Sequence, residues 1–295
     1  MRAGSGNLGP FMRRGEDSKV TWRIKDRLVE PHFPMVMGIL NTTPDSFHAA
    51  SRVAVDDVLR KAEMMVHDGA AILDVGGLST RPGSKEIAVE EELDRVLPAI
   101  ERLGKAFPEV IISIDTYRSE VARAAVGAGA GMVNDIGAGL LDPEMLRTVA
   151  QLHVPYVLMH MQGTPATMQK DPQYADVVKE VVLFLSERLN AARSAGIADV
   201  IIDPGFGFGK TTDHNFALLR GISSLKGLGV PVLAGLSRKR MINEVLGTTP
   251  DQALNGTTIL NTLALLKGVD ILRVHDVKEA VECMKLLERS QGSAR

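Results

Sequence analysis

Residues 110–137, VIISIDTYRSEVARAAVGAGAGMVNDIG, contain two short aliphatic runs separated by a longer segment. The first run is Val110–Thr116 and the second is Met132–Gly137, and both carry almost no charge until they end. Strands of a parallel sheet that is covered on both faces have this composition. The stretch therefore predicts a strand, a connecting helix and a second strand parallel to the first.

The same alternation extends in both directions along the chain. Three of the segments between runs show a helical period clearly, because their apolar residues fall on one helix face. Those faces consist of Val55, Val58, Leu59, Ala62 and Met65; of Val178, Val181, Val182, Leu185 and Leu189; and of Val277, Ala280, Val281 and Met284. The other six aliphatic runs are Met35–Asn41, Ala71–Gly77, Tyr156–His160, Val200–Asp203, Pro231–Gly235 and Ile271–His275.

Eight strand–helix units in about 260 residues predict an α/β protein with a closed (β/α)8 TIM barrel rather than an open Rossmann sheet. Before the first run, Val20–Ile24 and Arg27–Val29 flank the dipeptide Lys25-Asp26. This pattern predicts an N-terminal β-hairpin that caps the barrel bottom. No linker or low-complexity stretch divides the remainder, so we expect one domain over residues 20–295 after a flexible tail of residues 1–19.

The composition excludes several classes of protein. The chain of 295 residues has 34 Lys and Arg against 36 Asp and Glu, a net charge of −2, which disfavours a nucleic-acid partner. No apolar run approaches the ~18 residues that a membrane span needs, and residues 1–19 lack the apolar core of a secretory signal. The single Cys283 forms no internal disulfide and no multi-thiolate metal site. We expect a cytoplasmic protein.

Polar side chains stand at or near the end of nearly every aliphatic run. In a TIM barrel the chemistry is located at the carboxyl ends of the strands, so these residues predict one site. A lone Asp at such a position is more often a hydrogen-bonded loop residue or a helix cap. Capping alone does not explain this set at nearly every strand end, because Ser, Thr or Gly would also serve as caps. The residues are Asn41, Asp74, Asp115, Asn134, His160, Asp203, Ser237-Arg238-Lys239, Arg273 and His275.

The mixture of side chains limits the chemical class of ligand that the site can bind. Asp115, Asn134, Asp203 and Lys239 suit a flat heterocycle, because carboxylates accept from an amino-amidine edge and an ammonium donates to a ring carbonyl. A second set suits phosphate or pyrophosphate, through Arg, protonated His, hydroxyls and loop amides. That set is Thr42-Thr43, Ser79-Thr80-Arg81, Arg273 and His275. A heterocycle that carries a pyrophosphate would use both sets.

Three other interpretations are weaker. Residues 205–211, GFGFGKT, are similar to a phosphate-binding loop, but Pro204 stands where that loop needs its first Gly, so a tight strand-to-helix turn is preferred. The seven His show no HExxH-like spacing, which argues against a transition-metal site built by the protein alone. Lys239 could form a Schiff base in an aldolase-like barrel, but the ring-recognition residues around it fit that chemistry poorly.

The motifs at these strand ends resemble those of one family, the bacterial dihydropteroate synthases, which are pterin-binding enzymes. Residues 37–47, MGILNTTPDSF, resemble its opening signature, and residues 74–77 and 79–83, DVGG and STRPG, resemble its second. The resemblance covers about residues 20 to 290, with one motif at each junction between strand and helix. Further matching stretches are residues 113–116, 134–136, 159–161, 203–210, 237–239 and 273–276.

This resemblance implies a role for each matching residue. The pterin ring would be bound by Asp115, Asn134, Asp203 and Lys239, with Arg273 stacked on it. Asn41 would help to bind Mg²⁺ on the pyrophosphate. The anion would be surrounded by Thr80, Arg81, Arg273 and His275, and the p-aminobenzoate pocket would be formed by Ser237, Pro82 and Phe47. The catalytic residues would be Arg81, Asp115, Lys239, Arg273 and His275.

The family's reaction joins 6-hydroxymethyl-7,8-dihydropterin diphosphate to p-aminobenzoate and yields 7,8-dihydropteroate and pyrophosphate. The resemblance also implies folate biosynthesis, a homodimer and a sulfonamide target. The reacting carbon is attached to an electron-rich ring, so pyrophosphate can leave before the amine attacks. Arg81, Arg273 and His275, with Mg²⁺, would stabilise the departing charge, and Asp115 would stabilise the cation. The arylamine is neutral at pH 7 and needs no strong base.

Four stretches depart from the family pattern. His48-Ala49-Ala50-Ser51 stands where a Ser-Asp-Gly-Gly-like stretch is usual, and Leu78 stands where Glu is common. Arg240 replaces a usual Ser and Ala253 a frequent Arg. The altered first loop leaves open a second hypothesis, a relative that binds the pterin diphosphate with weak or no catalysis. A third, a pterin-dependent methyltransferase, is disfavoured by Ser79–Gly83 and Ser237–Lys239.

Overall fold

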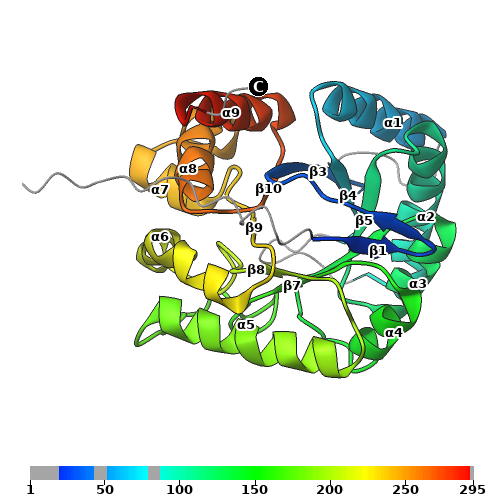
Figure 1. Ribbon diagram of the computed structural model, residues 1–295, viewed down its shortest axis with the longest axis horizontal. Coiled ribbons are helices and arrows are strands. Elements are labelled where there is room, and N and C mark those ends of the chain that lie inside the picture. The colour runs from blue at the N-terminus through cyan, green and yellow to red at the C-terminus, as the bar shows by residue number, and fades with distance from the viewer. Residues whose placement is uncertain (1–19, 43–51, 79–86, 293–295) are drawn as a thin grey trace, which may run out of the picture.

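The computed structural model describes residues 20–42, 52–78 and 87–292, and in them a ring of helices surrounds a ring of strands (Figure 1). In Figure 1 the helices follow one another once around the molecule, from blue α1 to red α9. The barrel strands are β3 (Met35–Asn41), β4 (Ile72–Gly76), β5 (Ile111–Asp115), β6 (Met132–Asp135), β7 (Tyr156–Met159), β8 (Val200–Asp203), β9 (Leu233–Ala234) and β10 (Ile271–Val274). The α-helices are α1 (Arg52–His67), α2 (Val89–Ala106), α3 (Ser119–Ala128), α4 (Met145–Leu152), α5 (Val177–Ser194), α6 (Thr212–Gly221), α7 (Arg240–Leu246), α8 (Leu254–Leu266) and α9 (Val277–Ser290).

The barrel strands are all parallel and pair in the order β8-β7-β6-β5-β4-β3-β10-β9. A single parallel bridge between Ile202 and Val232 joins the two ends of this order and closes the ring. The predicted TIM barrel is therefore confirmed. Strand β9 has only two residues, whereas the sequence predicts a strand over Pro231–Gly235. Pro231 has no N–H to donate to the ladder, which shortens the strand at its start.

The interior of the barrel has an apolar layer below a polar one. Because the side-chain period of a strand is two, a residue two positions further along points to the same side. Two residues after four members of the apolar layer come Asp74, Asn134, Asp203 and Arg273. The polar layer thus lies towards the carboxyl ends of the strands. The apolar layer belongs to one buried cluster that includes Met37, Ile72, Met132, Val157, Ile201, Leu233 and Ile271.

The hairpin of β1 (Trp22–Ile24) and β2 (Arg27–Val29) closes the opposite, amino-terminal end. The side chain of Trp22 is 1% exposed and joins the apolar cluster inside the barrel. The hairpin is fixed by two main-chain hydrogen bonds, from Arg23 N to Asp199 Oδ2 at 2.6 Å and from Lys25 N to the His153 carbonyl at 3.0 Å. The predicted cap at the barrel bottom is therefore confirmed.

The helices pack on the outside of the strands through the predicted faces. Val58, Ala62, Val181, Leu185 and Val277 are buried in the outer core, while the side chain of Val55 lies outside the described part of the chain. Residues 1–19, predicted as a tail, also lie outside it. Among the helices that the structure describes, none is long and apolar enough to cross a membrane.

Candidate active site

A pocket opens at the carboxyl end of the barrel, directly above the polar layer. Its walls come from strands β5 to β8 and β10 and from the loops that follow β8 and β9. Five of the ten lining residues are among those that the sequence predicts in the site. The lining consists of Asp115, Asn134, Ile136, Met159, Asp203, Phe206, Phe208, Gly235, Lys239 and Arg273.

Arg273 lies across the floor of this pocket. Its Nε donates to Asp74 Oδ2 and its Nη2 donates to Asp115 Oδ2, each at 2.6 Å. Asn134 Nδ2 donates to the same Asp74 oxygen at 2.9 Å, which leaves the Asn134 amide oxygen available as an acceptor. Burial opposes the charge of Arg273, but Asp74 and Asp115 raise the pKa of its guanidinium. The pocket is therefore built around a fixed cation with carboxylates on two sides.

The carboxylates of the pocket are poorly solvated. Burial raises the pKa of Asp115 to about 7, although the Arg273 guanidinium opposes the shift. Burial also raises the pKa of Asp203, and a hydrogen bond from Gly205 N to Asp203 Oδ1 at 2.7 Å opposes that shift. A ligand that donates N–H groups or carries positive charge would compensate for this desolvation. The electrostatics thus favour a donor-rich ring.

Lys239 faces the same pocket from the loop after β9. Its Nζ lies 4.5 Å from the centroid of the Phe208 ring, within the range of a cation–π contact. Burial and Arg273 lower the pKa of Lys239 to about 8, and Asp203 and Asp115 oppose the shift. An ammonium on this wall can donate to a ring carbonyl, as the sequence analysis expects.

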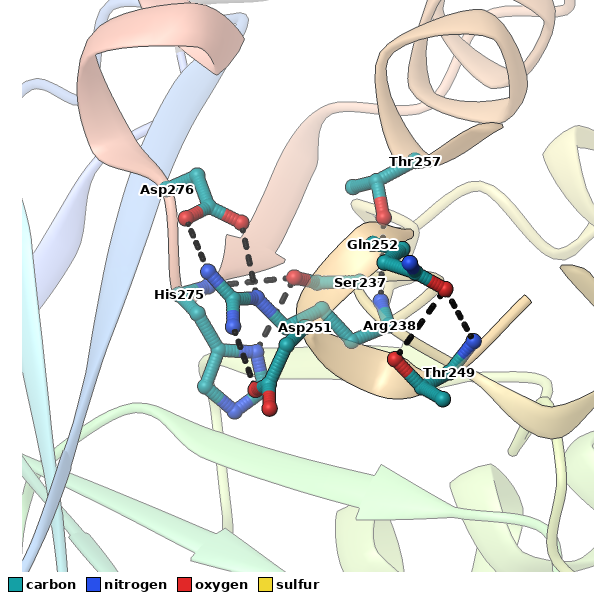
Figure 2. Close-up of polar contacts among 8 residues, drawn as sticks. All are labelled: Ser237, Arg238, Thr249, Asp251, Gln252, Thr257, His275 and Asp276. Atoms are coloured by element: carbon teal, nitrogen blue, oxygen red, sulfur yellow. Dashed lines mark hydrogen bonds and ion pairs between the residues drawn. The ribbon is translucent and has the colours of Figure 1, made fainter. Parts of the chain in front are cut away.

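Ser237 and His275 form a pair at the rim (Figure 2). Ser237 Oγ lies 3.0 Å from His275 Nδ1 and accepts from the His275 main-chain N–H at 3.2 Å. Desolvation, Arg273 and Arg238 lower the pKa of His275 to about 4. This shift favours a neutral imidazole in the site as it stands, whereas the predicted anion set includes a protonated His. With Nδ1 facing the Ser237 hydroxyl, a neutral imidazole presents Nε2–H as a donor.

Asn41 is the exposed last residue of β3, and strand β4 lies between β3 and β5. A Cβ built at Gly76, which separates them on β4, would lie 3.6 Å from Asn41 Oδ1 and 3.7 Å from Asp115 Oδ2. Both oxygens therefore border the same small space. Thr42, expected in the anion set, instead donates its hydroxyl to the Gly76 carbonyl at 3.2 Å. Within the described ranges, no group of three or more His, Cys, Asp or Glu could hold a metal ion by itself.

Residues 205–211 form a strand-to-helix turn, as preferred over a phosphate loop. A side chain at Gly205, where φ is +68°, would place its Cβ 1.9 Å from the His160 carbonyl oxygen, so only glycine fits. Buried Lys210 crosses the turn: its Nζ donates to the carbonyls of Gly205 and Phe208 at 2.9 and 3.0 Å. The same atom lies 2.8 Å from His160 Nδ1. His160 is thus used for structure beside the pocket.

Six predicted site residues lie outside the described residues: Thr43, Phe47, Ser79, Thr80, Arg81 and Pro82. The segments next to residues 79–86 are held by arginines. Arg95 Nη1 donates to the Gly77 carbonyl at 2.9 Å and Arg118 Nη2 donates to the Ile87 carbonyl at 2.7 Å. The chain is therefore anchored on both sides of residues 79–86.

Comparison with known proteins agrees with this geometry. A family model described as "Pterin binding enzyme" matches residues 37–275, which span the whole barrel from β3 to β10. The chain belongs to the pterin binding enzyme family. Within this family it is 45% identical to dihydropteroate synthase of Escherichia coli K12 over 258 residues, or 86% of this chain and 91% of the relative.

Solved structures of pterin binding enzymes give the same result. A dihydropteroate synthase from Yersinia pestis with a sulfonamide drug complex is 38% identical, with a TM-score of 0.87, and the match covers 93% of this chain and 100% of that one. The enzyme from Xanthomonas albilineans with 4-aminobenzoic acid is 46% identical, with a TM-score of 0.86 and coverage of 94% and 100%. The latter enzyme is also known in complex with 7,8-dihydropteroate, with a TM-score of 0.82, 44% identity and coverage of 93% and 100%.

Two residues of this pterin binding enzyme site have roles that the sequence did not predict: Asp74, which was expected at a strand end without an assigned contact, and Lys210. Asp74 holds Arg273 and Asn134, and Lys210 organises the turn that carries Phe206 and Phe208. The signal for Asp74 is its place two residues after Ile72, in register with the inward residues of the neighbouring strands. Lys210 had no comparable signal, because its partners are main-chain carbonyls and a His that is 50 positions away.

Proposed function

We propose that this chain is a dihydropteroate synthase. It transfers the pterin of 6-hydroxymethyl-7,8-dihydropterin diphosphate to p-aminobenzoate, forming 7,8-dihydropteroate and pyrophosphate in folate biosynthesis. The observation that carries the proposal is the convergence of Asp115, Asn134, Asp203, Lys239 and Arg273 on one pocket. The names of the relatives and their complexes with 4-aminobenzoic acid and 7,8-dihydropteroate support the same reaction.

In the proposed complex the pterin ring occupies the pocket. Buried carboxylates such as Asp203 accept the N–H groups of the amino-amidine edge, and Lys239 donates to the ring carbonyl. The amide oxygen of Asn134 accepts a further ring N–H, since its nitrogen is used by Asp74. Arg273 offers its guanidinium face to the ring for stacking while Asp74 and Asp115 hold its edge. Shape and polarity are thus set before the substrate arrives.

The reaction then requires stabilisation of two developing charges. The bond between the exocyclic carbon and the pyrophosphate oxygen breaks, and its electron pair leaves with pyrophosphate. Arg81, Arg273, Thr80 and the Nε2–H of His275 stabilise the departing anion. The ring-stabilised cation that remains is favoured by the carboxylate of Asp115.

The amine of p-aminobenzoate completes the reaction from the rim. Its nitrogen lone pair forms the new C–N bond, and the resulting arylammonium releases one proton to solvent. No protein base is needed, because the arylamine is neutral before it attacks. Ser237, Pro82 and Phe47 form the p-aminobenzoate pocket in this proposal, which also makes the chain a sulfonamide target like the Yersinia pestis enzyme.

Magnesium fits the oxygen donors near β3. Mg²⁺ prefers oxygen ligands and is often held by one or two protein groups together with substrate phosphates. Asn41 Oδ1 borders the space next to Asp115, and no carboxylate cluster in the described residues competes for the ion. Asn41 would therefore hold Mg²⁺ that is bound to the pyrophosphate. When bound, the ion supplies Lewis-acid stabilisation of the leaving group.

The proposal extends to assembly and location. Large apolar side chains that are exposed in the monomer gather on α7 and α8, which supports a homodimer through these helices. Sedimentation equilibrium of the full chain measures this state directly. The location in the proposal is the cytoplasm, where the single buried thiol of Cys283 stays reduced. The exposed residues are Val245, Leu246, Leu254, Ile259, Leu263 and Leu266.

The test is steady-state release of pyrophosphate from the pterin diphosphate, with and without p-aminobenzoate. We expect turnover that depends on p-aminobenzoate. Asp203→Ala should abolish pterin binding in a direct titration, whereas Arg81→Ala should mainly slow turnover. Tight pterin binding without p-aminobenzoate-dependent turnover would support the binding-only hypothesis instead, and equal loss of pterin affinity in both variants would contradict the assigned roles.

A further inference from the structure

Arg238 has an unusual main-chain conformation between two site residues. Its φ is +57°, in the left-handed region that a residue with a long side chain rarely adopts. Such conformations persist only where the surrounding structure holds them, and they are common at functional sites. The residues on either side are Ser237, which contacts His275, and Lys239, which lines the pocket. The turn at Arg238 thus directs two neighbouring side chains to different parts of the site.

Three groups hold Arg238 in place (Figure 2). Its main-chain N–H donates to Thr257 Oγ1 on α8 at 3.0 Å. Its guanidinium binds Asp276 in a fork, with Nη2 at 2.7 Å from Oδ1 and Nε at 3.1 Å from Oδ2. Nη1 lies 3.7 Å from the exposed Asp251. Forked pairs of this kind fix direction as well as distance.

Asp276 has an ordinary alternative that it does not use. It occupies the N-cap position of α9, where an Asp side chain usually accepts a main-chain N–H of the first helical turn. No such capping hydrogen bond is present, because both carboxylate oxygens face Arg238 instead. The start of α9 therefore lacks the usual side-chain cap, and Asp276 instead connects it to Arg238 in the loop after β9.

The link has consequences on both sides of the pocket. Asp276 follows His275 directly, and Arg238 lies between Ser237 and Lys239. The ends of β9 and β10 are therefore joined twice, by Ser237 with His275 and by Arg238 with Asp276 (Figure 2). Among the described residues, Arg238 does not line the pocket, whereas its neighbour Lys239 does.

We propose that Arg238 and Asp276 are a positioning pair that fixes the ring-binding Lys239 relative to the anion-binding His275. This inference rests on the proposed function, since it assumes that one substrate contacts both residues. The pair would set the distance between the pterin ring and the pyrophosphate. Neither residue has to touch the substrate.

The first test separates the side chain from the main chain. Glycine adopts a positive φ readily, so Arg238→Gly keeps the turn and removes the fork. We expect Arg238→Gly and Arg238→Gln both to lower kcat/KM for the pterin diphosphate by at least tenfold. Asp276→Asn should also lower kcat/KM by at least tenfold. The double variant Arg238→Gln/Asp276→Asn should lose no more kcat/KM than the single variant with the larger loss. Arg238→Gly with unchanged kcat/KM would overturn the proposal.

The matched control is Arg102→Gln. Arg102 of α2 also forms an ion pair with an Asp of another element, Asp56 of α1 at 2.7 Å, but both side chains are exposed on the outer surface and neither lines the pocket. This variant should stay within twofold of the parent protein. A tenfold loss in this variant would show that the assay reports general damage, and the effects at Arg238 would then carry no special meaning for the pair.

A second readout does not depend on turnover. The charged groups that act on His275 are Arg273, Arg238, Asp276 and Lys239. Burial is the largest cause of the low pKa of His275, so loosening of the rim should raise this pKa in both Arg238→Gln and Asp276→Asn. NMR titration of labelled His, assigned with His275→Gln, measures both. A lower pKa of His275 in Asp276→Asn would mean that the carboxylate acts on the imidazole only through its charge while the rim stays in place, and would overturn the inference. Wild-type protein without turnover would refute the proposed function but leave this result intact.

Discussion

Lys210 is a buried lysine whose partners are two carbonyls and an imidazole in the turn beside the pocket. Lys210→Met would leave these groups without their donor, and each unpaired buried polar group costs about 1–3 kcal/mol. We expect a net loss of about 2–3 kcal/mol in the free energy of unfolding at pH 7, because the methionine side chain recovers some apolar burial. Urea denaturation measures this quantity.

The pH dependence sharpens this test. Burial lowers the pKa of Lys210 from 10.5 to about 7, so between these values the unfolded chain binds a proton that the folded protein does not. Stability from this group is therefore present above pH 10.5 and is lost as the pH falls to about 7. The gap between the parent and Lys210→Met should widen from pH 7 to pH 9. Lys267→Met, which removes one exposed bond to the Arg220 carbonyl, should show a small and constant effect.

At this scale, a polar residue at the end of an aliphatic run was enough to find Asn134, Asp203 and Arg273, because the carboxyl ends of the barrel strands carry the site. The long-range contacts between site residues could not be predicted from the sequence. Arg238 and Asp276 are 38 positions apart, and their contact depends on the angles of two separate loops. The low pKa of His275 could not be predicted for a related reason: burial, Arg273 and Arg238 lower it together, and sequence spacing reports neither the burial nor the approach of Arg238.

The turn after β6 shows how elements cooperate to position a site residue. Asp135, next to Asn134, accepts from Gly137 N at 2.7 Å, from Gly139 N at 2.6 Å and from Tyr156 Oη of β7 at 2.6 Å. Tyr156→Phe would remove one donor from this buried carboxylate, for which we expect a loss of about 2 kcal/mol in the free energy of unfolding. Thermal or urea unfolding provides the measurement.

The chain contains a close comparison for that change. Tyr174→Phe also removes one hydroxyl, but its partner is the neutral carbonyl of Gly209 at 2.8 Å, so the loss should be about 1 kcal/mol or less. Equal losses in the two variants would show that the charge of Asp135 adds nothing. Burial raises the pKa of Asp135, and Tyr156 opposes that shift. The Phe variant should therefore raise this pKa further.

Residues that stabilise the barrel and residues of the proposed active site lie at opposite ends of the barrel axis. Trp22 closes the amino-terminal end, and the pocket lies at the other end. Trp22→Ala would open a cavity in the apolar layer and should cost about 3–5 kcal/mol of stability, with pterin affinity unchanged in protein that remains folded. Calorimetry and pterin titration measure the two effects. Leu28→Ala, at a position that is 76% exposed in the same hairpin, should leave both unchanged.

At this largest scale the sequence was most informative. Eight aliphatic runs, covered on both faces and separated by helical periods, are sufficient for the barrel, because a parallel sheet buries both of its faces and needs crossover helices. The hairpin followed from the two short runs around Lys25-Asp26. The length of β9 did not follow, since the run Pro231–Gly235 has the composition of a strand but only two of its residues form one.

The single bridge between Ile202 and Val232 has a consequence for local unfolding. Strand β9 is held by two register pairs to β10, and the one bridge to β8 is made by Val232 directly before it, so β9 has fewer ladder partners than the other barrel strands. Amides with few protecting hydrogen bonds exchange through local openings that cost less than global unfolding. The chain that carries Ser237, Arg238 and Lys239 thus leaves the barrel at its least protected seam. Contacts made beyond the strand, with Thr257, His275 and Asp276, take over the anchoring that the short ladder does not provide.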